Sequence, residues 1–213
     1  MNLSQPITYH NNANTTDKNF VIPEFTPVPP VCPDRVLEFV LIGNMRQAWE
    51  QHVYWMRMLL ISIAERLKDL EEVSARLLRN PTDIANIFGI FYTEEQAGII
   101  EDLLSEHLQI GAALITALRD ENTAEAENLK TQWYLNADQM ADMFSSINPF
   151  FDLEEVRRML YNHLDLTTEE VMMRLAGNYA ADIDAFDRVE QEAIMMADYF
   201  STGIIQQFPG RFL

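Results

Sequence analysis

The chain has 213 residues, 48% of them hydrophobic and 23% charged, so it is long enough to bury the core of one domain. Its formal net charge of -18 at pH 7 argues against nucleic acid and anionic membranes as partners, because both attract proteins through Lys and Arg. The seven glycines form no phosphate-binding loop pattern, which disfavours a nucleotide-binding α/β fold. A lone cysteine excludes an intrachain disulfide, and no signal peptide or membrane span is recognisable. These features predict an acidic cytoplasmic protein.

The first 34 residues differ in composition from the rest of the chain. They are rich in Asn and Thr and hold six of the nine prolines, which predicts an extended N-terminal arm, residues 1–34, ahead of one helical domain, residues 35–213. The arm contains His10 and Cys32, and neither has a neighbourhood that suggests chemistry. Its apolar residues would let part of it lie on the helical domain or on a neighbouring subunit, and the second alternative would give a homo-oligomer formed through the arm.

A short motif recurs along the domain. The segment 140–144, Met-Ala-Asp-Met-Phe, returns as Met-Ala-Asp-Tyr-Phe at 196–200 and more faintly as Ile-Ala-Asn-Ile-Phe at 84–88, with a spacing of 56 residues both times. A fixed spacing of this length indicates an internal repeat. We therefore expect three copies of one unit, at about residues 36–91, 92–147 and 148–204.

Helical periodicity predicts two antiparallel helices in each unit. In the first unit apolar residues recur at steps of three and four from Val36 to about Leu67 and again from Val73 to Phe91, with a kink at Pro81. The second unit begins with a capping-box pattern at Thr93 and Gln96 and turns at 120–123.

The third unit is expected to open near Asp152, after the turn signal Asn148-Pro149. Thr167 and Glu170 resemble a second helix start, so a break is predicted just after His163. The chain then turns at 176–178 and returns as a helix to about Gly203. The whole pattern predicts an all-α fold, a six-helix bundle of three repeated hairpins, compatible with ferritin-like or hemerythrin-like packing.

Six polar residues lie on the stripes that this pattern assigns to the core. Each outgoing helix carries one histidine and each return helix carries one Asn or Glu, and the six are His52, His107, His163, Asn80, Asn136 and Glu192. Residues equidistant from a hairpin turn lie at the same height, because both helices rise about 1.5 Å per residue. Each histidine should therefore face the polar residue of its own return helix, and all six should form one buried layer.

Two interpretations of this layer are open. Burying an unpaired polar group costs on the order of a few kcal/mol, so the layer must be satisfied. In the first interpretation His52, His107, His163 and Glu192 bind one zinc, iron or manganese ion, with Asn80 and Asn136 orienting the ligands. In the second the layer is a metal-free hydrogen-bond network, in which a protonated histidine faces Glu192 and fixes helix register, in a structural or protein-interaction module. The Glu-x-x-His and His-x-x-x-His patterns of known helical metal sites are absent from the sequence.

Several segments of the domain together resemble a known family. They are 50–57 (EQHVYWMR), 79–83 (RNPTD), 105–108 (SEHL), 133–138 (WYLNAD), 146–149 (SINP) and 203–208 (GIIQQF). Over about residues 44–208 the chain resembles an uncharacterised family of small, largely clostridial and bacillar bacterial proteins. Members sometimes carry the label acetylglutamate kinase, which this sequence does not support because it lacks the glycine-rich loops of such kinases. The resemblance implies no catalytic residues, and the sequence alone assigns no reaction.

Overall fold

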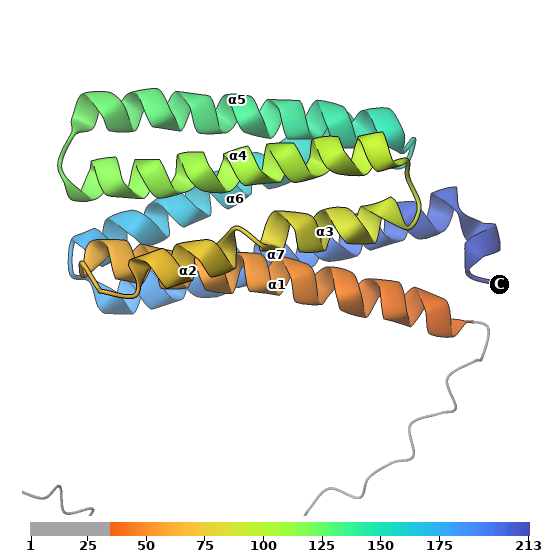
Figure 1. The fold of residues 1–213 in the computed structure, drawn as a ribbon, viewed down its shortest axis with the longest axis horizontal. Coiled ribbons are helices and arrows are strands. Elements are labelled where there is room, and N and C mark those ends of the chain that lie inside the picture. Colours follow the sequence, from red (N-terminus) through yellow and green to blue (C-terminus); the bar gives the residue numbers. More distant parts are fainter. Residues whose placement is uncertain (1–34) are drawn as a thin grey trace, which may run out of the picture. The chain divides into compact units, whose positions relative to one another are not determined.

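The computed structural model describes residues 35–213, and no strand occurs among them. In chain order the helices are α1 (Val36–Ala64), α2 (Leu70–Leu77), α3 (Asn80–Gly89), α4 (Glu94–Arg119), α5 (Thr123–Ile147), α6 (Leu153–Leu175), α7 (Tyr179–Gln207) and the short 3-10 helix η2 (Pro209–Arg211). Helices α2 and α3 follow one another along one side of α1, so the seven α-helices fill six positions (Figure 1). The prediction of an all-α six-helix bundle is confirmed. The predicted arm, with His10 and Cys32, lies outside the described residues.

The six positions form a closed ring. Going around it, α1 packs against α2 and α3, α3 against α4, α4 against α5, α5 against α6, α6 against α7, and α7 against α1 again. Helices α1, α4 and α6 occupy alternate positions and also contact one another across the interior. These are the helices on which the three histidines were predicted, so the packing brings the predicted polar residues toward a common centre.

The turns after α1, α4 and α6 share one geometry. A residue with positive φ follows each helix end, at Arg66 (φ 51°), Glu121 (φ 57°) and Gly177 (φ 71°). In each turn the next backbone N–H bonds to a carbonyl five residues back, as when Asn122 donates to Ala117. This is the Schellman pattern, which satisfies carbonyls at a helix end. The hairpin turns lie at the predicted residues 120–123 and 176–178.

Side-chain caps explain where several helices begin. Thr93 and Gln96 form the predicted capping box of α4. The side chains of Asn122, Asp152 and Asn178 accept a hydrogen bond from the first turns of α5, α6 and α7. Each cap satisfies one of the backbone N–H groups that a helix start leaves without an intrahelical acceptor.

The prediction of a helix break after His163 is wrong, because α6 runs without interruption from Leu153 to Leu175. Thr167 and Glu170, which resemble a cap in the sequence, are both buried in the bundle. The return path of the first hairpin does break, at Leu78-Arg79 just before the predicted kink at Pro81. Helix α1 ends three residues earlier than predicted and α7 continues four residues further.

Three phenylalanines form an aromatic layer in the core. Phe88, Phe144 and Phe200 end the three recurring motif segments, and all are almost fully buried. Their ring centroids are 5.3, 5.9 and 4.5 Å apart, within the range of favourable aromatic pairs. Residues 56 positions apart in sequence therefore meet in space in this layer.

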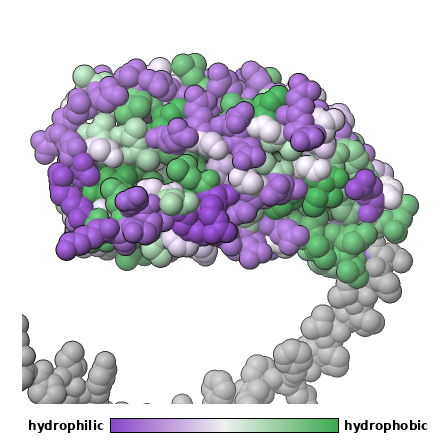
Figure 2. Space-filling view, viewed as in Figure 1, coloured by the Kyte–Doolittle hydropathy of each residue, from purple (hydrophilic) through white to green (hydrophobic). Residues whose placement is uncertain are grey.

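Exposed apolar side chains gather at the end of the bundle where α1 begins. Figure 2 shows hydrophilic side chains over most of the face in view and hydrophobic ones gathered near the beginning of α1. Val36, Leu37, Phe39 and Val40 are exposed there. None of the helices in residues 35–213 combines the length and hydrophobicity needed to cross a membrane.

Candidate metal centre

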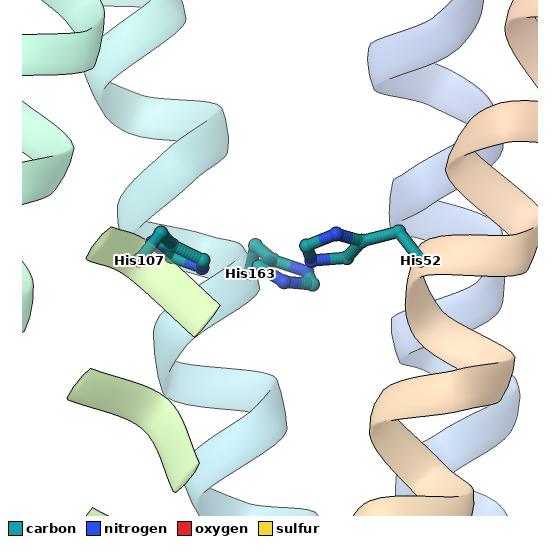
Figure 3. Close-up of side chains that lie close together, drawn as sticks. All are labelled: His52, His107 and His163. Carbon is teal, nitrogen blue, oxygen red and sulfur yellow. The ribbon is translucent and has the colours of Figure 1, made fainter. Parts of the chain in front are cut away.

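The three predicted histidines lie together in the interior. His52 of α1, His107 of α4 and His163 of α6 are 2%, 2% and 4% exposed. Their ring centroids are 6.0, 5.8 and 6.2 Å apart, close to an equilateral triangle. One ring nitrogen of each lies within 4.8 Å of the others, and Figure 3 shows the rings converging between the helices.

Two of the histidines are held by the predicted asparagines. His52 Nδ1 lies 3.1 Å from Asn80 Oδ1, and His107 Nδ1 lies 3.1 Å from Asn136 Oδ1. Because an amide oxygen only accepts hydrogen bonds, Nδ1 must carry the proton in both rings. Nε2 therefore keeps its lone pair, which is the form that binds a metal.

The backbone fixes the orientation of both amides. Asn80 Nδ2 donates to the carbonyl of Ala48 at 2.8 Å, and Asn136 Nδ2 donates to the carbonyl of Leu103 at 3.1 Å. Each carbonyl belongs to the residue four positions before the histidine that the same asparagine holds. The NH₂ group faces a carbonyl, so the oxygen must face the imidazole. The His52–Asn80 and His107–Asn136 pairs are thus two instances of one arrangement.

The third pair is not formed. His163 and Glu192 are both buried, yet His163 Nδ1 and Glu192 Oε1 have no hydrogen-bond partner within residues 35–213. Burial raises the pKa of Glu192, while nearby Asn162 and Arg158 act in the opposite direction. Glu192 does not belong to the group of converging ligand atoms, which consists of the three histidines. Its predicted role as a direct ligand stays a prediction.

All three imidazoles are neutral at pH 7. Burial lowers the pKa of His52 to about 4, against the effect of its bond to Asn80. Burial, together with repulsion from His52, lowers the pKa of His107 to about 3. The pKa of His163 is well below its usual value for the same reasons, with repulsion from both other rings. Neutral imidazole is the protonation state that coordinates metals.

The spacing of the triad suits one small transition metal ion. A point equidistant from three atoms 4.8 Å apart lies about 2.8 Å from each, whereas zinc–nitrogen bonds are about 2.0–2.1 Å long. Each imidazole would therefore move by less than about 1 Å on binding. Three imidazoles suit zinc, iron or copper, while manganese prefers oxygen ligands.

A second buried polar group lies near the α6–α7 turn. Arg57 of α1 donates to Glu170 of α6 at 2.5 Å and to Asp182 of α7 at 2.8 Å, and Arg174 reaches Asp182 at 3.4 Å. Glu170 and Asp182 are 2% and 0% exposed. The sequence interpretation did not identify this network. The sequence did indicate that Glu170 is buried, because it lies two helical turns after His163 and therefore on the same, core-facing side of the helix.

The comparisons with known proteins add no relative. A scan against protein-family models, a search of curated proteins and a search of solved structures each found no match to this chain. The resemblance to a clostridial and bacillar family therefore stays a prediction, and the geometry of the triad is the basis for a functional proposal.

Proposed function

We propose that the protein binds a single transition metal ion, with zinc the first expectation, through His52, His107 and His163. The observation that carries the proposal is the convergence of three buried, neutral imidazoles whose ring nitrogens lie within 4.8 Å of one another. Two of these rings are already in the tautomer that presents Nε2 to the centre.

We assign the asparagines and Glu192 to the shell around the ligands. Metal-bound histidines commonly donate their second N–H to an oxygen, which fixes the ring and raises its basicity. Asn80 and Asn136 accept such a bond from His52 and His107. Glu192 lies 56 residues after Asn136, and its unpartnered Oε1 matches the unpartnered Nδ1 of His163. In this proposal Glu192 accepts from His163 and supplies negative charge to balance the ion.

We also propose that the site arose from three copies of one hairpin. The three Schellman turns, the phenylalanine layer and the two equivalent His–Asn pairs support this interpretation. In a threefold arrangement one inward position per copy supplies three ligands at one height. This explains why each ligand comes from a different helix and why the motifs that place two ligands on one helix are absent.

The alternative is a metal-free network in a structural or protein-interaction module. Its supporting observation is that Asn80 and Asn136 satisfy both an imidazole and a backbone carbonyl without any ion. Under this alternative the histidines fix helix register, and an apolar replacement of His163, whose Nδ1 has no partner within residues 35–213, is neutral or stabilising.

Metal analysis of untagged protein separates the two functions. Protein from cells grown with added zinc, iron and manganese is expected to hold close to one ion per chain by elemental analysis. The variant His163→Leu removes one of the three ligands and should therefore lose the ion, and a cooperative thermal transition shows whether it keeps the fold. His10→Leu, which changes the histidine outside the described residues, is the matched control and should keep the ion.

Thermal unfolding gives an independent measurement. A bound ion stabilises the folded state by mass action, so EDTA should lower the melting temperature of the wild type but not of His163→Leu. Metal far below one ion per chain in the wild type, or an unchanged metal content in His163→Leu, would overturn the proposal.

A further inference from the structure

The histidine layer lies between two layers of different chemistry. In a helix each Cα–Cβ bond tilts toward the N-terminus, so the residue four positions after a layer residue leans back over it. On the side of the phenylalanines these residues are Ile84, Met140 and Met196, which follow Asn80, Asn136 and Glu192 and are all buried. An apolar wall therefore covers this side of the three imidazoles.

The side facing the hairpin turns is different. The residues four positions after the histidines are Met56, Gly111 and Thr167. Gly111 contributes no side chain, and a Cβ there would lie 3.3 Å from the Trp133 ring and 3.4 Å from the Met56 methyl group. Thr167 is 3% exposed and carries a hydroxyl group. Among the six residues that cover the histidine layer on its two sides, it is the one with a polar side chain.

The Thr167 hydroxyl makes no hydrogen bond within residues 35–213. Other helical threonines of this protein donate to the carbonyl four residues back, as Thr116 does to Ala112, Thr131 to Glu127 and Thr168 to Leu164. A buried hydroxyl without a partner costs on the order of 1–3 kcal/mol. A group that bonds to the Thr167 hydroxyl would remove this cost.

We infer that the metal centre keeps one coordination position, on the side of Thr167, for an exogenous ligand: a water molecule or a small anion that the Thr167 hydroxyl holds by a hydrogen bond. The inference rests on the proposed function, since it needs the ion on the three histidines. Three protein nitrogens leave the fourth position of a tetrahedral ion open. On the opposite side, Ile84, Met140 and Met196 offer no hydrogen-bond donor. The Nε1–H of Trp49, whose ring centroid lies 6.0 Å from that of His52, also lacks a partner within residues 35–213, but no polar residues lead from it toward an ion pair as they do from Thr167.

Polar residues continue from Thr167 toward the surface. Glu170 follows Thr167 by three residues on the same face of α6, and it accepts from Arg57, whose side chain is 15% exposed. This polar file runs through an otherwise apolar core.

Cobalt substitution with azide as the probe tests the inference. Co²⁺ on the three histidines gives visible absorption bands, and azide at the open position should change them in a saturable way. Thr167→Val keeps the side-chain shape but removes the hydroxyl, so azide affinity should fall about tenfold, equivalent to about 1.4 kcal/mol. Thr167→Ser should restore it. Thr168→Val, which removes the neighbouring hydroxyl that bonds to Leu164, is the control and should bind azide as the wild type does.

The outcomes separate this inference from the proposed function. Absence of cobalt bands in the wild type would overturn the metal site and the open position with it. Cobalt bands that azide does not change would leave the metal site standing and overturn the open position. Equal azide affinities for Thr167→Val and Thr168→Val would overturn the role of the Thr167 hydroxyl.

Discussion

At the scale of single residues, the three histidines differ in what accepts their Nδ1 proton. Asn80 and Asn136 serve two of them, and each asparagine also holds a backbone carbonyl. A carboxylate cannot donate to a carbonyl, so Glu192 cannot reproduce the full arrangement at the third position. In the proposed threefold repeat, Glu192 in place of an asparagine exchanges that backbone hydrogen bond for a carboxyl group.

Replacing Asn136 by Leu should weaken both the metal site and the fold. His107 would lose its acceptor and the carbonyl of Leu103 its donor, so the free energy of unfolding should fall by about 1–3 kcal/mol. Loss of such an orienting partner typically lowers metal affinity about 10–100-fold. Urea unfolding and competition with a chromophoric zinc chelator measure the two effects. Asn128→Leu, an exposed change on the same helix, is the control, and equal zinc affinities for the two variants would contradict the orienting role of Asn136.

At the scale of helices, two ion pairs join α1 to α7 in different surroundings. Arg57 is largely buried against Asp182 and also reaches Glu170 of α6, whereas Arg46 pairs with Asp198 on the surface. Removing one partner of a buried pair leaves a charge without compensation, while exposed pairs contribute little. The two pairs therefore allow a buried and an exposed ion pair between the same two helices to be compared.

Arg57→Met should destabilise the protein by about 3–5 kcal/mol, because Glu170 would lose its cation and Asp182 would keep only the 3.4 Å contact with Arg174. Arg46→Met, with the same change in side chain, should cost less than about 1 kcal/mol. Urea unfolding of both variants at pH 7 measures the difference. Similar losses in the two variants would show that burial does not set the strength of these pairs.

Local chemistry made much of the helix pattern readable from the sequence. Thr93, Asn122 and Gly177 act through their own backbone neighbourhoods, so the turns they mark lie where predicted. The histidine layer was also predictable, because heights in a hairpin follow from counting residues. The continuity of α6 was not, since Thr167 and Glu170 are polar in sequence but buried by tertiary packing. The Arg57 network depends on the same packing, because an arginine on a helix carries no sign of which helix it will meet.

At the scale of the whole molecule, buried titratable groups lie in two places along the bundle. The triad lies in the middle, and Glu170 and Asp182 lie toward the α6–α7 turn. The histidines have folded-state pKa values below the usual one, whereas burial raises the pKa of Glu170 to about 7 despite Arg57. The two groups therefore make stability depend on pH in opposite directions.

For the metal-free protein, treated with EDTA, the histidines should dominate the pH dependence of stability. Their pKa values are lowered by folding, so their contribution is complete above about pH 6.5 and is lost as pH falls toward about 4 and 3, by about 1.4 kcal/mol per pH unit for each ring. The raised pKa of Glu170 works the other way, since its contribution is present below about pH 4.5 and is lost as pH rises through about 7. Three rings outweigh the two buried carboxyls whose pKa is raised, Glu170 and Glu192, so the free energy of unfolding should fall between pH 6.5 and 5. Urea unfolding across this range checks the sign, and Glu170→Gln should steepen the fall by removing one of the opposing groups. A free energy of unfolding that stays constant from pH 6.5 to 5 would mean that the imidazoles can take up protons in the folded state, which their burial at the centre of the bundle should prevent.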